Sequence, residues 1–293
     1  RIKTIENESY ISREPAKEMT MEGLKFALLS GGTGYNDIAW NFQGYGLATA
    51  DDRQGSKDVW QAFSYLYTVI YHPTAGYVLF DVGLGPGEEC DRRPAEHRRI
   101  NPVEVRRDQY VDEGLKKLGL TVDDISAIVI SHCHWDHIGG LEFFKGTRAI
   151  RNVYVPYADF AHALVQTHRT PAGYSDSGYY RRNLDVEGAE FHLLEEETTL
   201  FPGVDVLLLE GHTPAVAGLV LHLDSGNYIL PSDAVTAEVC LRGTAAPGVI
   251  YDSLGFQRTR KRLLRLEQEL HASFVFPHDP WNFPEYILGE WIK

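Results

Sequence analysis

The sequence of 293 residues is poor in cysteine, in positive charge and in long apolar runs. Its cysteines, Cys90, Cys133 and Cys240, are too few and too scattered for a disulfide framework or for a zinc site made of thiolates. The formal net charge of −13 argues against a nucleic-acid backbone or an anionic membrane surface as partner. No run approaches about 18 apolar residues, so we expect no transmembrane helix.

The ends of the sequence give few signals for targeting or for a second domain. The first residues are polar and lack the apolar centre of a signal peptide, so we expect a cytoplasmic protein. The sequence begins with Arg1 instead of Met, which also fits a chain whose leader was removed. Residues 1–23 are expected to form an N-terminal arm. No linker interrupts the chain, and we expect residues 1–293 to form a single domain.

Short apolar runs between turn residues predict many strands, with helices in both halves. Residues 24–32 are predicted to be a strand that ends in a glycine turn, and a long loop is expected over 33–61. Further strands are predicted at 64–73, 76–83, 125–131, 151–156, 204–212, 218–224, 228–234 and 273–280. Three- and four-residue apolar steps and amphipathic patterns predict helices over 103–118, 159–168 and 254–271. This pattern predicts two packed sheets with helices outside.

The most informative segment follows the predicted strand 125–131 and has the order His132-x-His134-x-Asp136-His137. Residues two apart in an extended chain project to the same side, so His132 and His134 can present their imidazoles to one point. Asp136 and His137 come where the chain must turn, and they can face a second point nearby. Imidazole and carboxylate ligands suit Zn, Fe, Mn or Co.

Three further candidates, His212, Asp233 and His278, each follow an apolar run. A single histidine at the end of a strand is more often a hydrogen-bonded surface residue than a ligand. Together with the first segment, however, these residues would lie along one edge of the two sheets. We therefore expect them to complete a metal site there.

The order of these seven residues resembles the metallo-β-lactamase superfamily, and the similarity runs from about residue 64 to 285. The segment 80–83, which contains Asp81, is similar to that family's first motif. The resemblance implies an α/β fold, an αβ/βα sandwich of two mixed sheets with outer helices, and two divalent metal ions, expected to be zinc. The ligand sets that it implies are His132, His134 and His212 for one ion, Asp136, His137 and His278 for the other, and Asp233 as a bridge. Asp81 would orient the ligands from behind.

Within this superfamily, several segments point to one branch. The zinc β-lactamases usually have Cys where this sequence has Asp233. The segments at 211–214, 230–234 and 283–287 are most similar to the N-acyl homoserine lactonase and pyridoxolactonase group. This similarity implies a quorum-quenching type of lactonase that opens a small cyclic ester by attack of a hydroxide bridging two metals. Asp136 is expected to act as the catalytic proton shuttle.

One departure from that group keeps other activities open. The related lactonases typically carry a Tyr three residues after the bridging aspartate, where this sequence has Thr236. Hydrolysis of a cyclic amide or carbamate, a thioesterase of the glyoxalase II type, and a persulfide dioxygenase with one iron are the alternatives. A protein that keeps the sandwich without catalysis is disfavoured, because it would not need all seven candidate ligands.

The substrate is expected to be a small cyclic molecule, with neither nucleic acid nor membrane as partner. Loops 33–61 and 169–188 are expected to wall the cleft, and the long loops near the N-terminus also suit a homodimer contact. The residues expected to form the substrate pocket are Phe42, Tyr45, Trp60, Tyr174 and Thr236.

Overall fold

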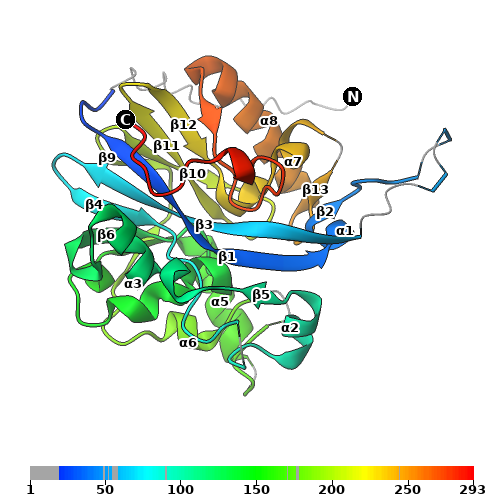
Figure 1. The fold of residues 1–293 in the computed structure, drawn as a ribbon, viewed down its shortest axis with the longest axis horizontal. Coiled ribbons are helices and arrows are strands. Elements are labelled where there is room, and N and C mark those ends of the chain that lie inside the picture. The colour runs from blue at the N-terminus through cyan, green and yellow to red at the C-terminus, as the bar shows by residue number, and fades with distance from the viewer. Residues whose placement is uncertain are drawn as a thin grey trace, which may run out of the picture.

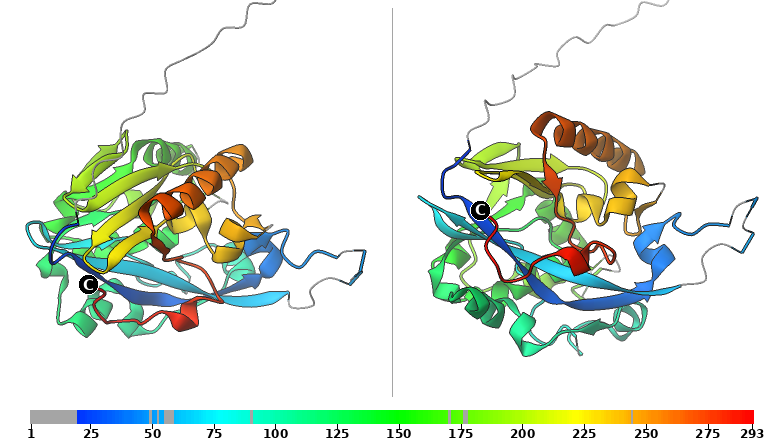
Figure 2. Two further views of the ribbon diagram at one scale, coloured as in Figure 1. Left: turned by 90° about the horizontal axis from the view of Figure 1, so that it is seen from above. Right: turned by 45° about the horizontal axis from the view of Figure 1, so that its top comes forward.

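The computed structural model describes residues 20–48, 50–51, 53–54, 59–89, 91–169, 171–175, 178–243 and 245–293. The expected N-terminal arm therefore lies outside the described residues, apart from its last four positions. Two large mixed sheets face each other, and helices cover the outer side of each sheet (Figures 1 and 2). The predicted α/β sandwich is confirmed.

The first sheet has seven strands in the order β5-β1-β3-β4-β6-β7-β8. Their bounds are β1 Lys25–Asp37, β3 Trp60–His72, β4 Gly76–Phe80, β5 Val103–Glu104, β6 Ile125–Val129, β7 Val153–Pro156 and β8 Phe191–Leu194. The pairs β5-β1, β1-β3 and β3-β4 are antiparallel, whereas β4, β6, β7 and β8 are parallel to one another. The parallel part brings the carboxyl ends of β4 and β6 to the same edge, which is where the first motif and the histidine segment begin.

The second sheet has five strands in the order β14-β12-β11-β10-β9. Their bounds are β9 Thr198–Phe201, β10 Val204–Leu209, β11 Val216–Leu223, β12 Gly226–Leu230 and β14 Ser273–Phe274. A small extra sheet pairs β2 Phe42–Gln43 with β13 Ala246–Pro247. The strands β9 to β12 follow one another as antiparallel neighbours, and β14 joins β12 in parallel.

Helices lie on the two outer faces, except for short ones such as α4, which follows the end of β6 between the sheets. Their bounds are α1 Ile38–Asn41, α2 Ala95–Ile100, α3 Val111–Gly114, α4 Trp135–Ile138, α5 Tyr157–His168, α6 Arg181–Leu184, α7 Glu238–Arg242 and α8 Ser253–Leu270. Figure 1 shows α7 and α8 with the second sheet and α3, α5 and α6 on the opposite side of the molecule. Among the described residues, no helix is both long and apolar enough to cross a membrane.

The alternation of side chains along β11 explains how the layers hold together. Ala217, Leu219 and Leu221 belong to the core between the two sheets, whereas Val216 and Val220 pack in the core beneath α8. Both faces of the strand are therefore buried, and the sequence reads as one continuous apolar run.

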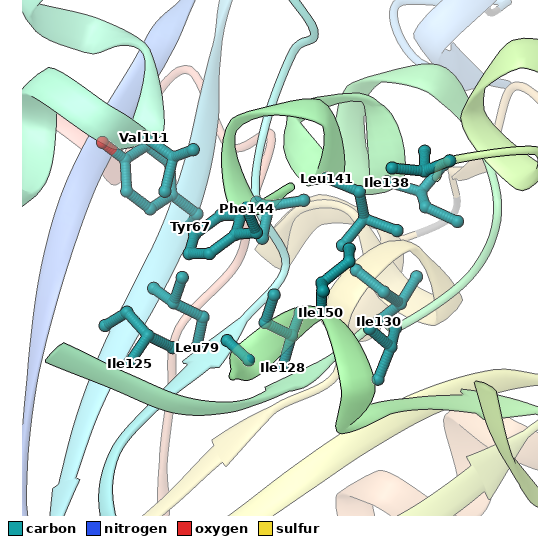
Figure 3. Close-up of a cluster of buried hydrophobic side chains, with 14 of the residues drawn as sticks. Tyr67, Leu79, Val111, Ile125, Ile128, Ile130, Ile138, Leu141, Phe144 and Ile150 are labelled. Carbon is teal, nitrogen blue, oxygen red and sulfur yellow. The ribbon is translucent and has the colours of Figure 1, made fainter. Parts of the chain in front are cut away.

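A third core lies on the outer face of the first sheet (Figure 3). Leu79 of β4 and Ile128 of β6 contribute from the sheet, and Val111, Leu141 and Phe144 contribute from the helical segments above it. The neighbours of Leu79 in β4, by contrast, belong to the core between the sheets. This core supports the chain on either side of the histidine segment.

The predicted glycine turn after residue 32 is wrong, and with it the start of the loop 33–61. Strand β1 continues to Asp37, and β3 begins at Trp60. The glycines permit close contact between strands: a Cβ at Gly34 would lie 2.4 Å from Cζ of Phe63. A glycine in a strand can mark such close packing as well as a turn.

Two other predicted elements are much shorter than expected. Residues 103–118 contain the two-residue strand β5, the helix α3 and separate 3₁₀ turns, although Val111 and Leu115 are buried as the spacing indicated. The last predicted strand, 273–280, is ordered as a strand only over β14. Pro277 and Pro280 have no backbone N–H to continue the ladder. Sequence reasoning missed β8, β9, α2 and α7 altogether.

Candidate metal centre

The histidine segment is fixed between the two sheets at the end of β6. The Ile130 N–H donates to the carbonyl of Tyr154 in β7 over 2.8 Å. The Ala217 N–H of β11 donates to the carbonyl of Ser131, also over 2.8 Å. His134 then caps the one-turn helix α4, which contains Asp136 and His137. The chain thus turns where the sequence indicated, directly after the second histidine.

Three imidazoles from the two halves of the chain form the first group of candidate ligands. The Nε2 atom of His132 lies 3.0 Å from Nδ1 of His134. The Nε2 atom of His212 lies 3.0 Å from the same His134 atom. One nitrogen from each ring therefore converges on a common point, with all such atoms within 4.8 Å of one another.

The second group contains Asp136, His137 and His278. The Nε2 atoms of His137 and His278 each lie 3.6 Å from Oδ2 of Asp136. His278 comes from the segment after β14, so the two sheets contribute to this group as well. The structure thus brings these three side chains together, and His132, His137 and Asp233 form a further group of donors that connects the two sets.

Asp233 lies between the two groups and faces both. Its Oδ1 atom lies 3.1 Å from Nε2 of His278 and 3.5 Å from Nε2 of His137. Its Oδ2 atom lies 3.3 Å from Nε2 of His212. Each oxygen of this carboxylate thus faces a different group, as a bridging ligand requires.

Hydrogen bonds on the outer side of the rings fix which nitrogen faces inward. The Nδ1 atoms of His137, His212 and His278 each face an atom that can only accept a hydrogen bond. These acceptors are a carboxylate oxygen of Asp81 at 2.8 Å, the Val249 carbonyl at 2.8 Å and the Ser64 carbonyl at 2.6 Å. In each neutral ring Nδ1 therefore carries the proton, and Nε2 presents a lone pair to the cluster.

Burial and charge set the protonation of the groups in two different ways. Burial, reinforced by neighbouring histidines, lowers the pKa values of His132 and His134 well below the usual range. Burial also opposes the charged form of His137, but the nearby carboxylates, led by Asp233, outweigh it and raise the pKa well above normal. The pKa of Asp233 is held well below its usual value, because the histidines around it outweigh the cost of burial. The first group is therefore ready to bind a cation as neutral imidazoles.

This donor set fits metal ions and is poorly satisfied without them. The Nε2 atom of His137 and the Oδ1 atom of Asp233 are buried and have no hydrogen-bond partner within the described structure. Inward lone pairs and carboxylate oxygens also crowd together at 3.0 to 3.6 Å. Buried polar groups normally have partners, and nitrogen and oxygen donors of this kind suit zinc and other first-row divalent metals.

A cavity of about 860 Å³, including its mouth, opens directly onto the candidate ligands. Its floor contains His134, Asp136, His212, Asp233 and His278. Its walls are largely apolar, with a few polar side chains and glycines, and consist of Trp40, Asn41, Phe42, Phe63, Arg93, His97, Ile100, Asn101, Trp135, Gly178, Thr236, Pro247, Gly248 and Val249. An apolar cavity with a few polar groups beside a metal centre is typical of a small-molecule site.

Of the predicted pocket residues, Phe42 and Thr236 line this cavity, but Tyr45, Trp60 and Tyr174 do not. The ring of Tyr45 instead packs against that of Trp281, with 5.1 Å between the centroids, beside a separate shallow pocket. Trp60 opens β3 and is 54% exposed. The Tyr174 hydroxyl donates to a carboxylate oxygen of Glu96 over 3.2 Å. The extra length of β1 and β3 moves Trp60 away from the site.

Residues 58–278 of this chain match a family model that is described as the metallo-beta-lactamase superfamily. The chain belongs to this superfamily. A curated relative, N-acyl homoserine lactonase AiiB of Agrobacterium fabrum, is 31% identical over 228 residues, which cover 73% of this chain and 79% of the relative. As a member of this family, the chain is a metal-dependent hydrolase similar to lactonases.

Two solved structures share the fold. A quorum-quenching N-acyl homoserine lactone hydrolase gives a TM-score of 0.75 at 19% identity, covering 94% of this chain and 100% of that chain. AidC, a dizinc quorum-quenching lactonase, gives a TM-score of 0.62 at 17% identity, covering 90% of each chain. At these identities the similarity shows the metallo-β-lactamase fold.

Asp81 lies behind the cluster, directly after β4. Its Oδ1 atom accepts the Ser131 N–H over 2.7 Å, and its Oδ2 atom accepts the Ser131 hydroxyl over 2.8 Å. The same Oδ2 atom accepts Nδ1–H of His137. The Asp81 carboxylate thus connects the end of β4 to the start of the histidine segment and to one candidate ligand.

Sequence reasoning missed Asp159 and Tyr179, which support the other side of this metallo-hydrolase centre. The buried Asp159 carboxylate accepts the Cys133 N–H over 2.7 Å and the Tyr179 hydroxyl over 2.6 Å. The Tyr179 ring packs on His134, with 4.6 Å between the centroids. Asp159 lies in the first turn of α5, where an acidic residue is ordinary, and Tyr179 lies in an insertion without periodicity. Their spacing therefore carried no signal.

Proposed function

We propose that this chain opens a small cyclic ester, a lactone, by hydrolysis at a centre of two divalent metal ions. The observation that carries the proposal is the placement of Asp233, whose two oxygens face separate groups of ligands. A centre for a single ion would need only one of these groups.

Each ion would have its own set of ligands, with Asp233 shared between them. His132, His134 and His212 would hold one ion, and Asp136, His137 and His278 the other. Zinc is the proposed metal, because the donors are imidazoles and carboxylates and because the similar AidC is a dizinc lactonase.

When bound, two divalent ions would lower the pKa of a shared water toward neutrality and polarise the ester carbonyl. The chain's own residues would do the rest. Asp136 lies both on the cavity floor and among the candidate ligands, so its carboxylate would take the proton of the attacking water and return it to the leaving alkoxide. The apolar walls, which include Phe42, Phe63 and Trp135, would hold the substrate away from bulk water.

The proposed substrate class follows from the relatives, which are N-acyl homoserine lactonases. Thr236 lies in the cavity wall and its hydroxyl is 3.8 Å from the sulfur of Cys240. It is shorter than the Tyr expected there, so the oxyanion of the reacting ester would be stabilised mainly by metal charge. We therefore propose that the substrate is a lactone whose ring and side arm differ from those of the substrates of lactonases that carry a tyrosine at this position.

The test combines a substrate panel with metal analysis. A lactone, a matched lactam and a thioester are compared at equal concentration, and the metal content per chain is measured by mass spectrometry. We expect the lactone to be hydrolysed fastest, by a protein that holds two metal ions. A faster thioester, or one iron with oxygen consumption on a persulfide, would overturn the proposal.

Asp233→Ala separates the bridging role from a general loss of charge. We expect this variant to lose most bound metal and most activity together. Asp205→Ala is the matched control, because it removes the same negative charge from β10, the strand that leads to His212. Asp205 lies seven residues before that candidate ligand. Full activity of a metal-free Asp233→Ala protein would contradict the proposed mechanism.

A further inference from the structure

Arg93 is a buried cation in the wall of the cavity. Its side chain is the largest among the fully buried ones, and the residue is only 2% exposed. Nevertheless it lines the same cavity as the candidate metal ligands. Within the described part of the chain, no carboxylate oxygen lies within 4.0 Å of its guanidinium nitrogens.

The protein satisfies only part of the Arg93 guanidinium. Its Nε atom donates to the Glu88 carbonyl over 2.6 Å, and its Nη2 atom donates to the Asn101 carbonyl over 2.9 Å. The group lies over the ring of Trp135, with 4.1 Å from Cζ to the centroid. A guanidinium has five N–H donors, so three of them, including both on Nη1, have no acceptor among the described residues.

The carboxylate of Glu88, whose backbone carbonyl contacts Arg93, does not pair with this charge. The Glu88 carboxylate is fully buried, and it accepts hydrogen bonds from Arg182 over 2.8 Å and from the Gly85 N–H over 3.0 Å. Only the backbone carbonyl of Glu88 contacts Arg93. A buried charge without a counter-ion is costly, and buried charges in proteins are normally paired. The missing counter-ion is therefore expected from outside the chain.

Asn101 adds a second donor to the same wall. Its Oδ1 atom accepts the Tyr65 hydroxyl over 3.4 Å, which leaves the side-chain NH₂ group to face other acceptors. Around these two polar residues the wall is apolar, with Phe63, Ile100 and Trp135. A ligand that fits this wall has an apolar arm that ends in an acceptor group.

We propose that Arg93 and Asn101 form a carboxylate subsite and that the substrate is a lactone whose apolar arm carries a carboxylate. This inference rests on the proposed lactonase function. A carboxylate is planar and matches the paired N–H donors at the end of a guanidinium, which makes such pairs strong and directional. Trp135, on which Arg93 lies, stands between His134 and Asp136 in the chain. The subsite is thus one side chain away from the candidate metal ligands.

The test uses two N-acyl lactones with the same ring and the same chain length. One acyl chain ends in a carboxylate and the other in a neutral carboxamide, and kcat and KM are measured with the metal-loaded enzyme. We expect the carboxylate to be preferred about tenfold or more in kcat/KM, mainly through KM, because hydrogen bonds to charged groups are the stronger kind. In Arg93→Gln the ratio of kcat/KM for the carboxylate to kcat/KM for the carboxamide should fall to about one, whatever the absolute rate of this variant.

Arg99→Gln is the matched control. Arg99 is an exposed residue of α2 outside the cavity, so this variant removes the same charge from the same segment. We expect it to keep the wild-type preference. Because Arg93 also holds two loop carbonyls, a second variant, Asn101→Asp, keeps Arg93 and supplies an internal carboxylate. This variant should shift the preference toward the carboxamide.

Equal kcat/KM for the two substrates in the wild type would overturn the subsite, as would an unchanged carboxylate preference in Arg93→Gln. Calorimetry with two ester-free acyl amides, ending in carboxylate and in carboxamide, separates this inference from the proposed reaction. Carboxylate binding that depends on Arg93, without any lactone turnover, would support the subsite and defeat the lactonase. Lactone turnover without carboxylate preference would defeat the subsite alone.

Discussion

The Asp81 carboxylate provides the sharpest test of how the metal centre is organised. It is only 3% exposed, and it joins Ser131 to His137 through three hydrogen bonds of 2.7 to 2.8 Å. Its backbone has a φ of 60°, in the left-handed region that Asn tolerates better than most residues. Asp81→Asn is therefore a substitution that keeps both the shape and the backbone.

The expected effect of Asp81→Asn is on the tautomer of one ligand. With Oδ1 still accepting the Ser131 N–H, the new NH₂ group must face His137 and donate to its Nδ1 atom. The His137 proton then moves to Nε2, the atom that faces the cluster, and removes a ligand lone pair. Loss of such an outer partner typically lowers metal affinity or activity about 10- to 100-fold, about 1.4 to 2.8 kcal/mol.

Metal content is measured against a chelator series, and the fold is checked by far-UV circular dichroism. We expect Asp81→Asn to lose the ion of the Asp136–His137–His278 group at a chelator concentration at which the wild type keeps both ions. Asp205→Asn is the control, since Asp205 forms a similar pair with His222, at 3.0 Å, without contacting the cluster. Two ions held with wild-type affinity by a folded Asp81→Asn protein would refute the reasoning.

Three further predictions concern stability. Removal of metal by a chelator should lower the thermal midpoint and added zinc should restore it, because an ion that binds only the folded state stabilises it; an unchanged midpoint in differential scanning calorimetry would argue against a metal centre. Tyr179→Phe should lower the free energy of unfolding by about 1 to 3 kcal/mol, because Asp159 loses a buried hydrogen-bond donor. Urea denaturation measures this loss. A loss below about 0.5 kcal/mol, which is usual for surface changes, would count against the prediction. The hydrogen bond with His222 lowers the pKa of Asp205 in the folded protein. The ionised carboxylate therefore stabilises the fold at pH values above about 4, the pKa of an aspartate in the unfolded chain. This contribution is lost as the pH falls through the lower pKa of the folded state. The stability advantage of wild type over Asp205→Asn should therefore shrink in urea titrations below about pH 4, and an advantage that grows there would contradict this assignment.

The candidate metal ligands could be predicted from the sequence because they follow the ends of predicted strands. His132, His212 and His278 each come shortly after a buried apolar run, and a strand order that aligns those ends brings the side chains together. The buried runs were visible because strands such as β6 and β11 are covered on both faces. This pattern indicated two packed sheets with a cluster at one edge, whereas the αβ/βα sandwich and the division of the ligands into two sets came from the resemblance to the superfamily.

The extent of individual elements was harder to predict, because it depends on the neighbouring chain. Gly34 falls in the predicted loop 33–61, yet it lies inside β1, where Phe63 leaves no room for a side chain. Asp159 and Tyr179 could not be recognised either, since they act through contacts across the fold that follow no sequence period. Local propensity is a weak guide wherever tertiary packing decides.

If the proposed subsite holds, substrate selection depends on tertiary contacts more than the hydrolytic chemistry does. Four arginines, Arg92, Arg93, Arg98 and Arg99, lie within one charged segment that the sequence gives no reason to distinguish. The fold distinguishes them: Arg92 pairs with Glu142, Arg99 is exposed, and Arg93 alone of the four lines the cavity. A change in this segment would therefore alter which arm the cavity accepts while leaving the ligands at the strand ends, and with them the hydrolysis, in place.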